Sequence, residues 1–206
     1  MINKNNFPLS TLKSQLSNSG GFQIVCLSGQ MAAGKNFVAA LLEKELGFAS
    51  IDLDVVVHRA IEICTPEIFG AFAEEASEAG IVLSNADGSL NRRALGSLIF
   101  PRPELLARQE GIVYPKVIEI TKQYIEENKA KNTPVLINAT VLYKTPELLE
   151  LCDRIFFVKA CTIKRFFRAR KRDGMAFAQI LQRFRSQKGL LKKYRESGKE
   201  IVIIRN

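Results

Sequence analysis

Long apolar runs are missing from this chain of 206 residues. No stretch approaches the roughly 18 consecutive apolar residues that a membrane-spanning helix needs. The first residues, Met1–Gly20, are polar and lack the apolar core of a secretory signal. With 47% hydrophobic and 25% charged residues, the composition is also unlike that of a disordered or collagen-like chain. We therefore expect a globular cytoplasmic protein that is not associated with a membrane.

Cysteine and histidine are scarce and scattered. The single histidine, His58, has no serine or cysteine motif near it in sequence, which argues against a nucleophilic triad. No cysteine pair has the C-x-x-C spacing, which argues against a zinc site. Reduced, partly buried thiols are the expected state of the cysteines. These are Cys26, Cys64, Cys152 and Cys161.

Acidic residues are outnumbered, with 21 Asp and Glu against 30 Lys and Arg, for a net charge of +9. The excess is concentrated between Lys159 and Lys199, where fourteen basic residues accompany only Asp173 and Glu196. Such a segment indicates an anionic partner or a solvated face. Nucleic acid, phosphorylated small molecules and acidic lipid surfaces all satisfy this pattern.

Short apolar segments alternate with helical patterns along the chain. Residues 1–21 are expected to form a loose N-terminal extension. Alternating strands and helices predict a parallel sheet covered by helices, with ligands at the carboxyl ends of the strands. The expected strands are 22–27, 48–51, 135–138, 154–158 and 201–204. The expected helices are 34–46, one capped by Asp54, 65–79, 91–100, 103–131 with an interruption near Tyr114-Pro115, 161–171 and 176–188.

A glycine-rich motif, G-x-x-x-x-G-K, follows the first expected strand and opens the first expected helix. The glycines let successive backbone N–H groups point at phosphate oxygens, and the helix N-terminus adds its positive dipole end. Lys35 is expected to reach the β- and γ-phosphates of a nucleotide. The residues predicted to bind the nucleotide are Gly29, Gln30, Met31, Ala32, Ala33, Gly34, Lys35 and Asn36.

Asn36 stands where this motif usually has a serine or threonine whose hydroxyl is a ligand of Mg²⁺. An amide oxygen is a hard, neutral ligand, but it is longer and differently aimed. We expect Asn36 to be the metal residue, and the sequence leaves open direct ligation, ligation through a water, and slow turnover.

The chain from Ile24 to Asn206 resembles the dephospho-coenzyme A kinase family of P-loop enzymes. Beyond the phosphate loop, it carries the family's Asp-x-Asp at Asp52–Asp54 and its D-G-x-L-x-R segment at Asp87–Arg92. The family's basic lid, with an Arg-Asp-Gly and an Arg-x-x-x-Gln, matches Lys164–Gln187. The combination of these motifs is far more specific than the phosphate loop alone.

The resemblance implies an α/β parallel-sheet P-loop kinase fold over residues 22–206. It further implies a helical acceptor-binding insertion at about 62–130 and a basic helical lid at about 162–190. The implied reaction transfers the γ-phosphate of ATP to the ribose 3′-hydroxyl of dephospho-CoA. ATP and Mg²⁺ are the implied cofactors, dephospho-CoA is the partner, and nucleic acid is not. The oligomeric state stays open.

The resemblance also implies roles for individual residues. Lys35 and one lid arginine, Arg165, would act on the transferring phosphoryl group, with Arg168 and Arg172 as further lid candidates. Asp54 matches the carboxylate near the acceptor hydroxyl, where it would accept a proton or hold a metal-bound water. The expected catalytic residues are thus Lys35, Asp54 and Arg165, and the expected substrate-binding residues are Asp52, Arg92 and Arg172.

Three positions depart from the family pattern. Asn36 replaces a hydroxyl residue, Tyr114 replaces a histidine, and Lys144 replaces a glutamate. They keep open a diverged nucleotide-binding protein with little or no kinase activity. A related kinase with another acceptor is disfavoured by the D-G-x-L-x-R segment. A nucleic-acid binder is disfavoured because the lid phenylalanines fit helix cores better than base-stacking positions.

Overall fold

A computed structural model describes residues 21–174 and 176–206. The expected N-terminal extension, residues 1–21, lies outside the described residues except for Gly21. The contacts divide the chain into two compact units. Unit 1 comprises the chain up to Asp52 together with Gln123–Asn206, and unit 2 comprises Leu53–Lys122. The two boundaries of unit 2 lie before those of the insertion expected from the sequence.

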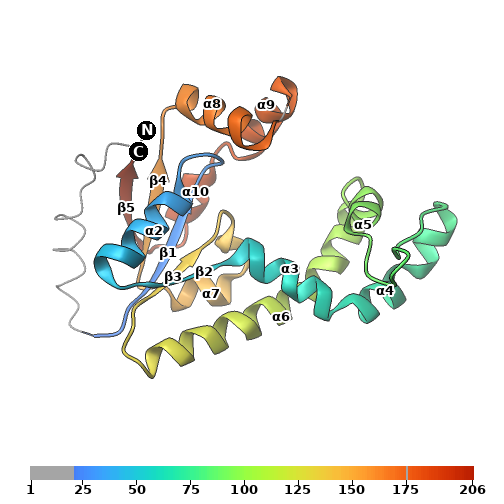
Figure 1. The fold of residues 1–206 in the computed structure, drawn as a ribbon, viewed down its shortest axis with the longest axis horizontal. Helices are drawn as coiled ribbons and strands as arrows, with labels where there is room; N and C mark the ends of the chain where they lie inside the picture. The colour runs from blue at the N-terminus through green and yellow to red at the C-terminus, as the bar shows by residue number, and fades with distance from the viewer. Residues whose placement is uncertain (1–20, 175) are drawn as a thin grey trace. The chain divides into compact units, whose positions relative to one another are not determined.

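Unit 1 is built on a five-stranded sheet whose paired strands are all parallel (Figure 1). The strand order is β2-β3-β1-β4-β5, which places β1 at the centre. The sequence predicted all five strands and their order along the chain. Their bounds are β1 Ile24–Gly29, β2 Ala49–Asp52, β3 Val135–Asn138, β4 Arg154–Lys159 and β5 Glu200–Arg205.

The apolar core of unit 1 forms where helix α2, Lys35–Leu46, packs on the sheet. Every residue of β1 is buried, as expected for a central parallel strand covered on both faces. Val25 and Leu27 pack in one cluster with Val38 and Leu42 of α2. Gly47 ends α2 in a left-handed conformation and donates its N–H back to the helix. This packing fixes the start of α2 at the carboxyl end of β1.

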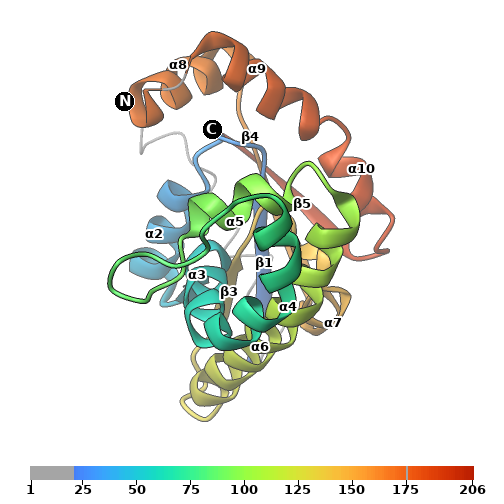
Figure 2. The same cartoon turned by 90° about the vertical axis from the view of Figure 1, so that its right-hand side faces the viewer.

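Basic helices follow β4 in unit 1. Figures 1 and 2 show α8 continuing from the carboxyl end of β4, with α9 next to it. The sequence predicted α8 and α9 and the break at Gly174, which ends α8 with φ 60°. It did not predict the short helices η2, α7 and α10. Their bounds are η2 Leu142–Lys144, α7 Pro146–Leu151, α8 Thr162–Asp173, α9 Phe177–Ser186 and α10 Leu190–Arg195.

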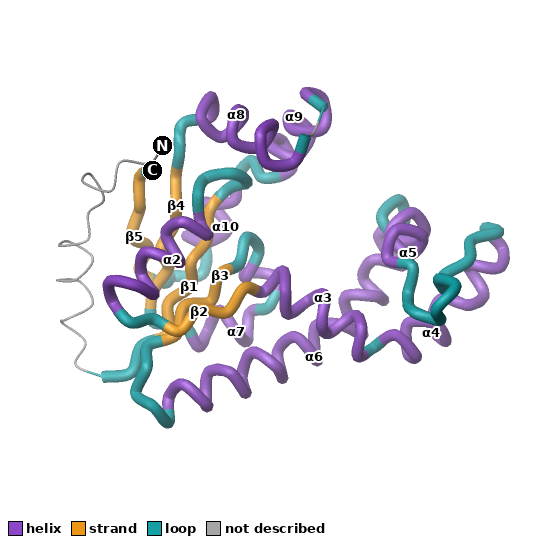
Figure 3. The backbone as a smooth tube through the Cα atoms, viewed as in Figure 1, coloured by secondary structure: helices purple, strands orange, loops and turns teal. Residues whose placement is uncertain are grey.

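Unit 2 consists of helices and the loops that join them (Figure 3). Ile68 and Phe72 of α4 and Leu95 and Leu98 of α5 are among its buried apolar residues. The expected cap at Asn91 is confirmed, because its side chain accepts the N–H of Ala94 at 3.0 Å. The helices are α3 Leu53–Ile63, α4 Thr65–Glu78, α5 Arg92–Ile99 and α6 Pro103–Lys129, whose last turns belong to unit 1.

Two sequence predictions about these helices are wrong. Asp54 does not cap α3, because the helix begins at Leu53 and Asp54 lies in its first turn. The helix expected to break near Tyr114-Pro115 is continuous, with Pro115 inside it. A proline there costs one backbone hydrogen bond and some distortion. The buried side chains of Val113 and Val117, on either side of Pro115, anchor the helix across that point.

Among the residues that the structure describes, no helix is both long enough and apolar enough to cross a membrane.

Candidate active site

The phosphate loop connects β1 to α2 and has the backbone that its glycines permit. Gly29 has φ 157°, and a Cβ atom there would lie 2.5 Å from the carbonyl oxygen of Val158. Gly34 has φ 99°, a left-handed conformation that glycine adopts without strain. Between them, the N–H of Ala33 donates to the carbonyl oxygen of Gln30 at 3.0 Å. The loop therefore curls directly into the N-terminus of α2, where backbone N–H groups favour an anion.

Lys35 is held at this loop by neutral acceptors. Its Nζ donates to Thr140 Oγ1 at 2.8 Å and to the carbonyl oxygen of Gly29 at 3.4 Å. Thr140 follows β3, so the contact joins two neighbouring strand ends of the sheet. The sequence predicted Lys35 as a phosphate-binding residue, but it did not single out Thr140 as a partner of Lys35.

Polar side chains of three elements meet beside the loop. Asn138, the last residue of β3, donates its amide Nδ2 to Asn36 Oδ1 at 3.1 Å and to Asp52 Oδ2 at 3.3 Å. Asp52 ends β2, and Asn36 lies in the first turn of α2. Asp52 and Asn36, two predicted site residues, thus both accept hydrogen bonds from the buried amide of Asn138. Sequence analysis missed Asn138, although its position at the end of a predicted strand is the place where parallel sheets bind ligands.

Arg165 lies in the first turns of α8 and is 4% exposed. Its Nε donates to the carbonyl oxygen of Met31 at 2.9 Å, and its Nη1 donates to Gln30 Oε1 at 2.8 Å. The guanidinium also lies 4.2 Å over the ring of Phe184, a cation–π contact. Burial lowers the pKa of Arg165 from its usual value. Its Nη2 is buried and has no hydrogen-bond partner among the described residues.

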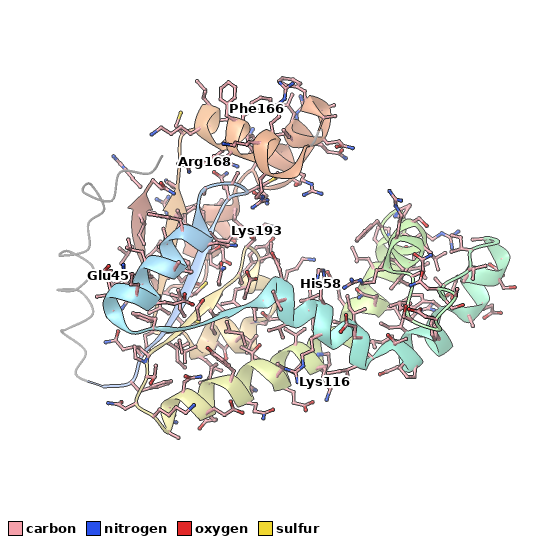
Figure 4. The ribbon with its side chains drawn as sticks, in the orientation of Figure 1. Glu45, His58, Lys116, Phe166, Arg168 and Lys193 are labelled. Carbon is pink, nitrogen blue, oxygen red and sulfur yellow. The ribbon has the colours of Figure 1, made fainter. Side chains whose placement is uncertain are left out.

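Two residues to which the sequence analysis gave no role also hold the loop. Gln187 Oε1 accepts the backbone N–H of Met31 at 2.6 Å. Asn206 Nδ2 donates to the carbonyl oxygen of Ala33 at 2.9 Å. Arg168 of α8 donates its Nη1 to the same carbonyl oxygen at 3.4 Å (Figure 4). Sequence spacing gives no signal for such contacts, because they join segments more than 130 residues apart.

A pocket of about 520 Å³ opens between the phosphate loop and α8. This volume is within the range of small-molecule sites. Arg172, a predicted substrate-binding residue, lies in its wall with two other basic side chains of α8. The lining residues are Ala32, Ala33, Gly34, Lys35, Asn36, Phe37, Arg168, Lys171 and Arg172. The pocket therefore combines a helix N-terminus with positive charge, which suits a polyphosphate.

The loop after β3 is fixed by Tyr194 of α10. The Tyr194 hydroxyl accepts the N–H of Leu142 at 2.9 Å and donates to the carbonyl oxygen of Thr140 at 3.2 Å. Ser28 Oγ donates to that carbonyl oxygen at 3.1 Å. Burial raises the pKa of Tyr194, which keeps its hydroxyl protonated. Ser28 is fully buried and braces this loop.

Unit 2 holds a second pocket of about 520 Å³. The D-G-x-L-x-R segment supplies four of its nine lining residues, and Arg92 and Arg93 are its two cationic side chains. The lining residues are Ile61, Glu62, Thr65, Asn85, Ser89, Leu90, Asn91, Arg92 and Arg93. Asp54, the predicted acceptor carboxylate, is exposed on the first turn of α3 in the same unit.

The remaining departures from the family pattern lie outside both pockets. Tyr114 donates its hydroxyl to Glu110 Oε1, one helical turn earlier on α6, at 3.1 Å. Lys144 is exposed at the end of η2. Neither residue lines the phosphate-loop pocket or the pocket of unit 2.

Comparisons with known proteins agree with this geometry. The dephospho-CoA kinase family model matches residues 23–205. The dephospho-CoA kinase of Treponema pallidum is 34% identical over 167 residues, which are 81% of this chain and 78% of the relative. That of Treponema denticola is 32% identical over 187 residues, covering 89% and 82%.

The solved structures point the same way. The crystal structure of TT1252 from Thermus thermophilus superposes with a TM-score of 0.73 at 26% identity and covers 90% of this chain and 89% of that one. Together with the strand order and the phosphate loop, these likenesses identify a P-loop kinase fold. The chain therefore belongs to the dephospho-CoA kinase family.

Proposed function

We propose that this kinase transfers the γ-phosphate of ATP to the ribose 3′-hydroxyl of dephospho-CoA. The observation that carries the proposal is Lys35, held at the mouth of the phosphate loop by Thr140 and Gly29. Phosphoryl transfer requires positioning and charge neutralisation more than covalent chemistry. A fixed lysine and a ring of backbone N–H groups supply both.

The pocket beside the loop is the proposed ATP site. Its basic wall from α8 and the N-terminus of α2 suit a triphosphate. Arg165 is the lid arginine that we assign to the transferring phosphoryl group, because its Nη2 is the donor left over after the loop contacts are made. A guanidinium there stabilises the charge that develops on the phosphoryl oxygens.

The acceptor side of the proposal rests on unit 2. Asp54, exposed on α3, would accept the proton of the attacking hydroxyl. The pocket with Arg92 and Arg93 would bind a phosphate group of dephospho-CoA, since a guanidinium pairs with phosphate through two parallel hydrogen bonds. The basic segment would thus serve phosphorylated small molecules in the cytoplasm, and not nucleic acid.

Mg²⁺ is the proposed metal, and the donor set fits it. Asp52 supplies a carboxylate and Asn36 an amide oxygen, the hard oxygen ligands that Mg²⁺ prefers. The amide oxygen of Asn138 in the same cluster is buried and has no hydrogen-bond partner among the described residues. Asp52 and Asn36 would hold the ion, directly or through water. When bound, Mg²⁺ supplies charge neutralisation for the phosphates of ATP.

The test is phosphorylation of dephospho-CoA with ATP and Mg²⁺, with the product identified by mass. We expect one phosphate added at the ribose 3′-position. The Lys35→Ala variant is the matched control for a contaminating kinase. Nucleotide binding without product would favour the alternative, a diverged nucleotide-binding protein, and product only with another alcohol would identify another acceptor.

A further inference from the structure

Asn138 is a buried side chain whose two polar atoms behave differently. The residue is 4% exposed. Its Nδ2 contacts Asn36 Oδ1 and Asp52 Oδ2, and its Oδ1 has no hydrogen-bond partner among the described residues. A buried polar atom without a partner costs about 1–3 kcal/mol, so a position that keeps one calls for a functional explanation.

The amide of Asn138 ties together two oxygen-bearing side chains that come from different elements. An –NH₂ group has two donors, and here they are directed at the oxygens of Asn36 on α2 and Asp52 on β2. Asn36 is exposed and Asp52 is partly exposed, so each keeps a surface toward solvent. A carboxylate and an amide oxygen held together in this way are hard oxygen ligands of the kind that a cation or its water shell takes.

We propose that Asn138 is the positioning residue for the metal pair Asn36 and Asp52 in this kinase. This inference rests on the proposed function, since it concerns the Mg²⁺ that accompanies ATP. The hydroxyl oxygen of a serine or threonine on α2 is placed by one side-chain torsion, χ1, whereas the amide oxygen of Asn36 also turns about χ2. The hydrogen bond from Asn138 removes that freedom. The amide of Asn138 therefore orients the longer side chain that this chain has at position 36.

The proposal gives opposite expectations for two substitutions of similar size. Asn138→Leu removes the donor and leaves the two oxygens without their link. Residues that hydrogen-bond to metal ligands contribute about 10–100-fold to metal affinity. The factor by which Mg²⁺ raises the affinity for ATP should therefore be at least about tenfold smaller in this variant than in the wild type. Asn138→Asp places a second carboxylate against Asp52. Repulsion should then weaken metal-free ATP binding, while Mg²⁺ should strengthen binding more than in the wild type.

The experiment is calorimetric titration of a non-hydrolysable ATP analogue, with and without Mg²⁺, accompanied by Mn²⁺ titration followed by electron paramagnetic resonance. The matched control is Asn128→Leu in α6. Asn128 is 8% exposed and donates its Nδ2 to the carbonyl oxygen of Tyr124 at 2.8 Å. This control should change the melting temperature and leave the Mg²⁺ dependence of binding at its wild-type value.

Opposite shifts in the Leu and Asp variants support the proposal. It is overturned if either variant keeps the wild-type Mg²⁺ dependence, or if both shift in the same direction. If Asn138→Leu does not fold, the direction found for Asn138→Asp decides. Failure of the proposed function is a separate result. It would be seen if the wild-type protein binds no nucleotide, or binds it and does not phosphorylate dephospho-CoA. That result would refute the proposed reaction, but it would not refute the hydrogen bonds from Asn138 to Asn36 and Asp52.

Discussion

The phosphate loop and the pocket of unit 2 are built in different ways. The loop is held by Thr140, Arg165, Gln187 and Asn206, which lie 105 to 173 residues from their partners in the chain. The pocket of unit 2 is lined by two short stretches, 61–65 and 85–93. One binding region is thus a product of tertiary structure, and the other is largely local.

This difference determines what a substitution does in each region. Arg165 is buried, and Thr140, Gln187 and Asn206 are partly buried, so their removal leaves polar atoms of the loop without these partners. Arg92 and Arg93 are exposed, and their removal changes the charge available to a ligand and little else. Substitutions of the residues that hold the loop should therefore lower stability and ATP binding together, whereas substitutions in the pocket of unit 2 should affect binding of the acceptor alone.

The largest effect is expected for Lys35→Ala. Losing the loop cation that we expect to reach the β- and γ-phosphates should lower kcat/KM on the order of 10²–10³-fold or more, as loss of a single preorganised donor does in other enzymes. The fold should persist, because Lys35 is only partly buried and its removal leaves the backbone of the loop and its glycines in place. The measurement is kinase activity beside a thermal melt, and turnover equal to that of the wild type would contradict the phosphate-loop assignment.

Arg165→Ala should have the next largest effect. It removes donors to the Met31 carbonyl and to Gln30 and a cation–π contact with Phe184. We expect a loss of about 1–3 kcal/mol in unfolding free energy, a higher KM for ATP and, from the role proposed for Arg165 at the phosphoryl group, a lower kcat. Arg170→Ala, at an exposed position of the same helix, is the matched control and should change neither. A variant that loses only kcat, with unchanged stability and KM, would mean that Arg165 acts on the phosphoryl group and does not brace the loop.

Arg92→Ala should leave stability and the KM for ATP unchanged and raise the KM for dephospho-CoA. Truncation of an exposed arginine that pairs with a phosphate typically costs about 1.4–3 kcal/mol, or roughly 10- to 150-fold. Arg93→Ala is its comparison, because both residues line the same pocket. Steady-state kinetics with each substrate varied in turn measures both. A rise in the KM for ATP in either variant would break the distinction between the two regions.

The fold was largely predictable because its signals are local. Each strand is a short apolar run, and Gly34, Gly47 and Gly174 mark helix ends through their left-handed backbone. The phosphate loop was found for the same reason, since its chemistry is confined to eight consecutive residues. Pro115 misled the analysis because a proline usually interrupts a helix, whereas buried neighbours hold this one intact.

The supports of the site were not predictable, because they depend on which strand ends become neighbours. Asn138 and Thr140 act on Asn36 and Lys35 only after β3 pairs with β1. Tyr194 lies on a helix of 6 residues, LLKKYR. This helix is too short and too highly charged to show a clear apolar stripe in the sequence. Its role as a brace of the loop after β3 is visible only in the folded chain.

The smallest expected effect on catalysis tests that brace. Tyr194→Phe keeps the buried ring against Phe157 but removes the acceptor for Leu142 N–H and a donor to Thr140. The expected loss is about 1–3 kcal/mol of unfolding free energy, with a modest decrease in kcat through Thr140 and Lys35.

Its pH dependence has a definite sign. Burial raises the pKa of Tyr194 in the folded protein, so the wild type loses stability as the pH rises above about 10, where the unfolded chain ionises first. Tyr194→Phe should remove that contribution and flatten the alkaline decline in urea unfolding midpoints. Tyr124→Phe is the matched control: burial also raises the pKa of Tyr124, but this residue is only partly buried, so the flattening should be smaller. An alkaline decline in Tyr194→Phe as steep as in the wild type would mean that the Tyr194 hydroxyl ionises in the folded protein as readily as in the unfolded chain. Tyr194 would then not hold the loop as a protonated donor.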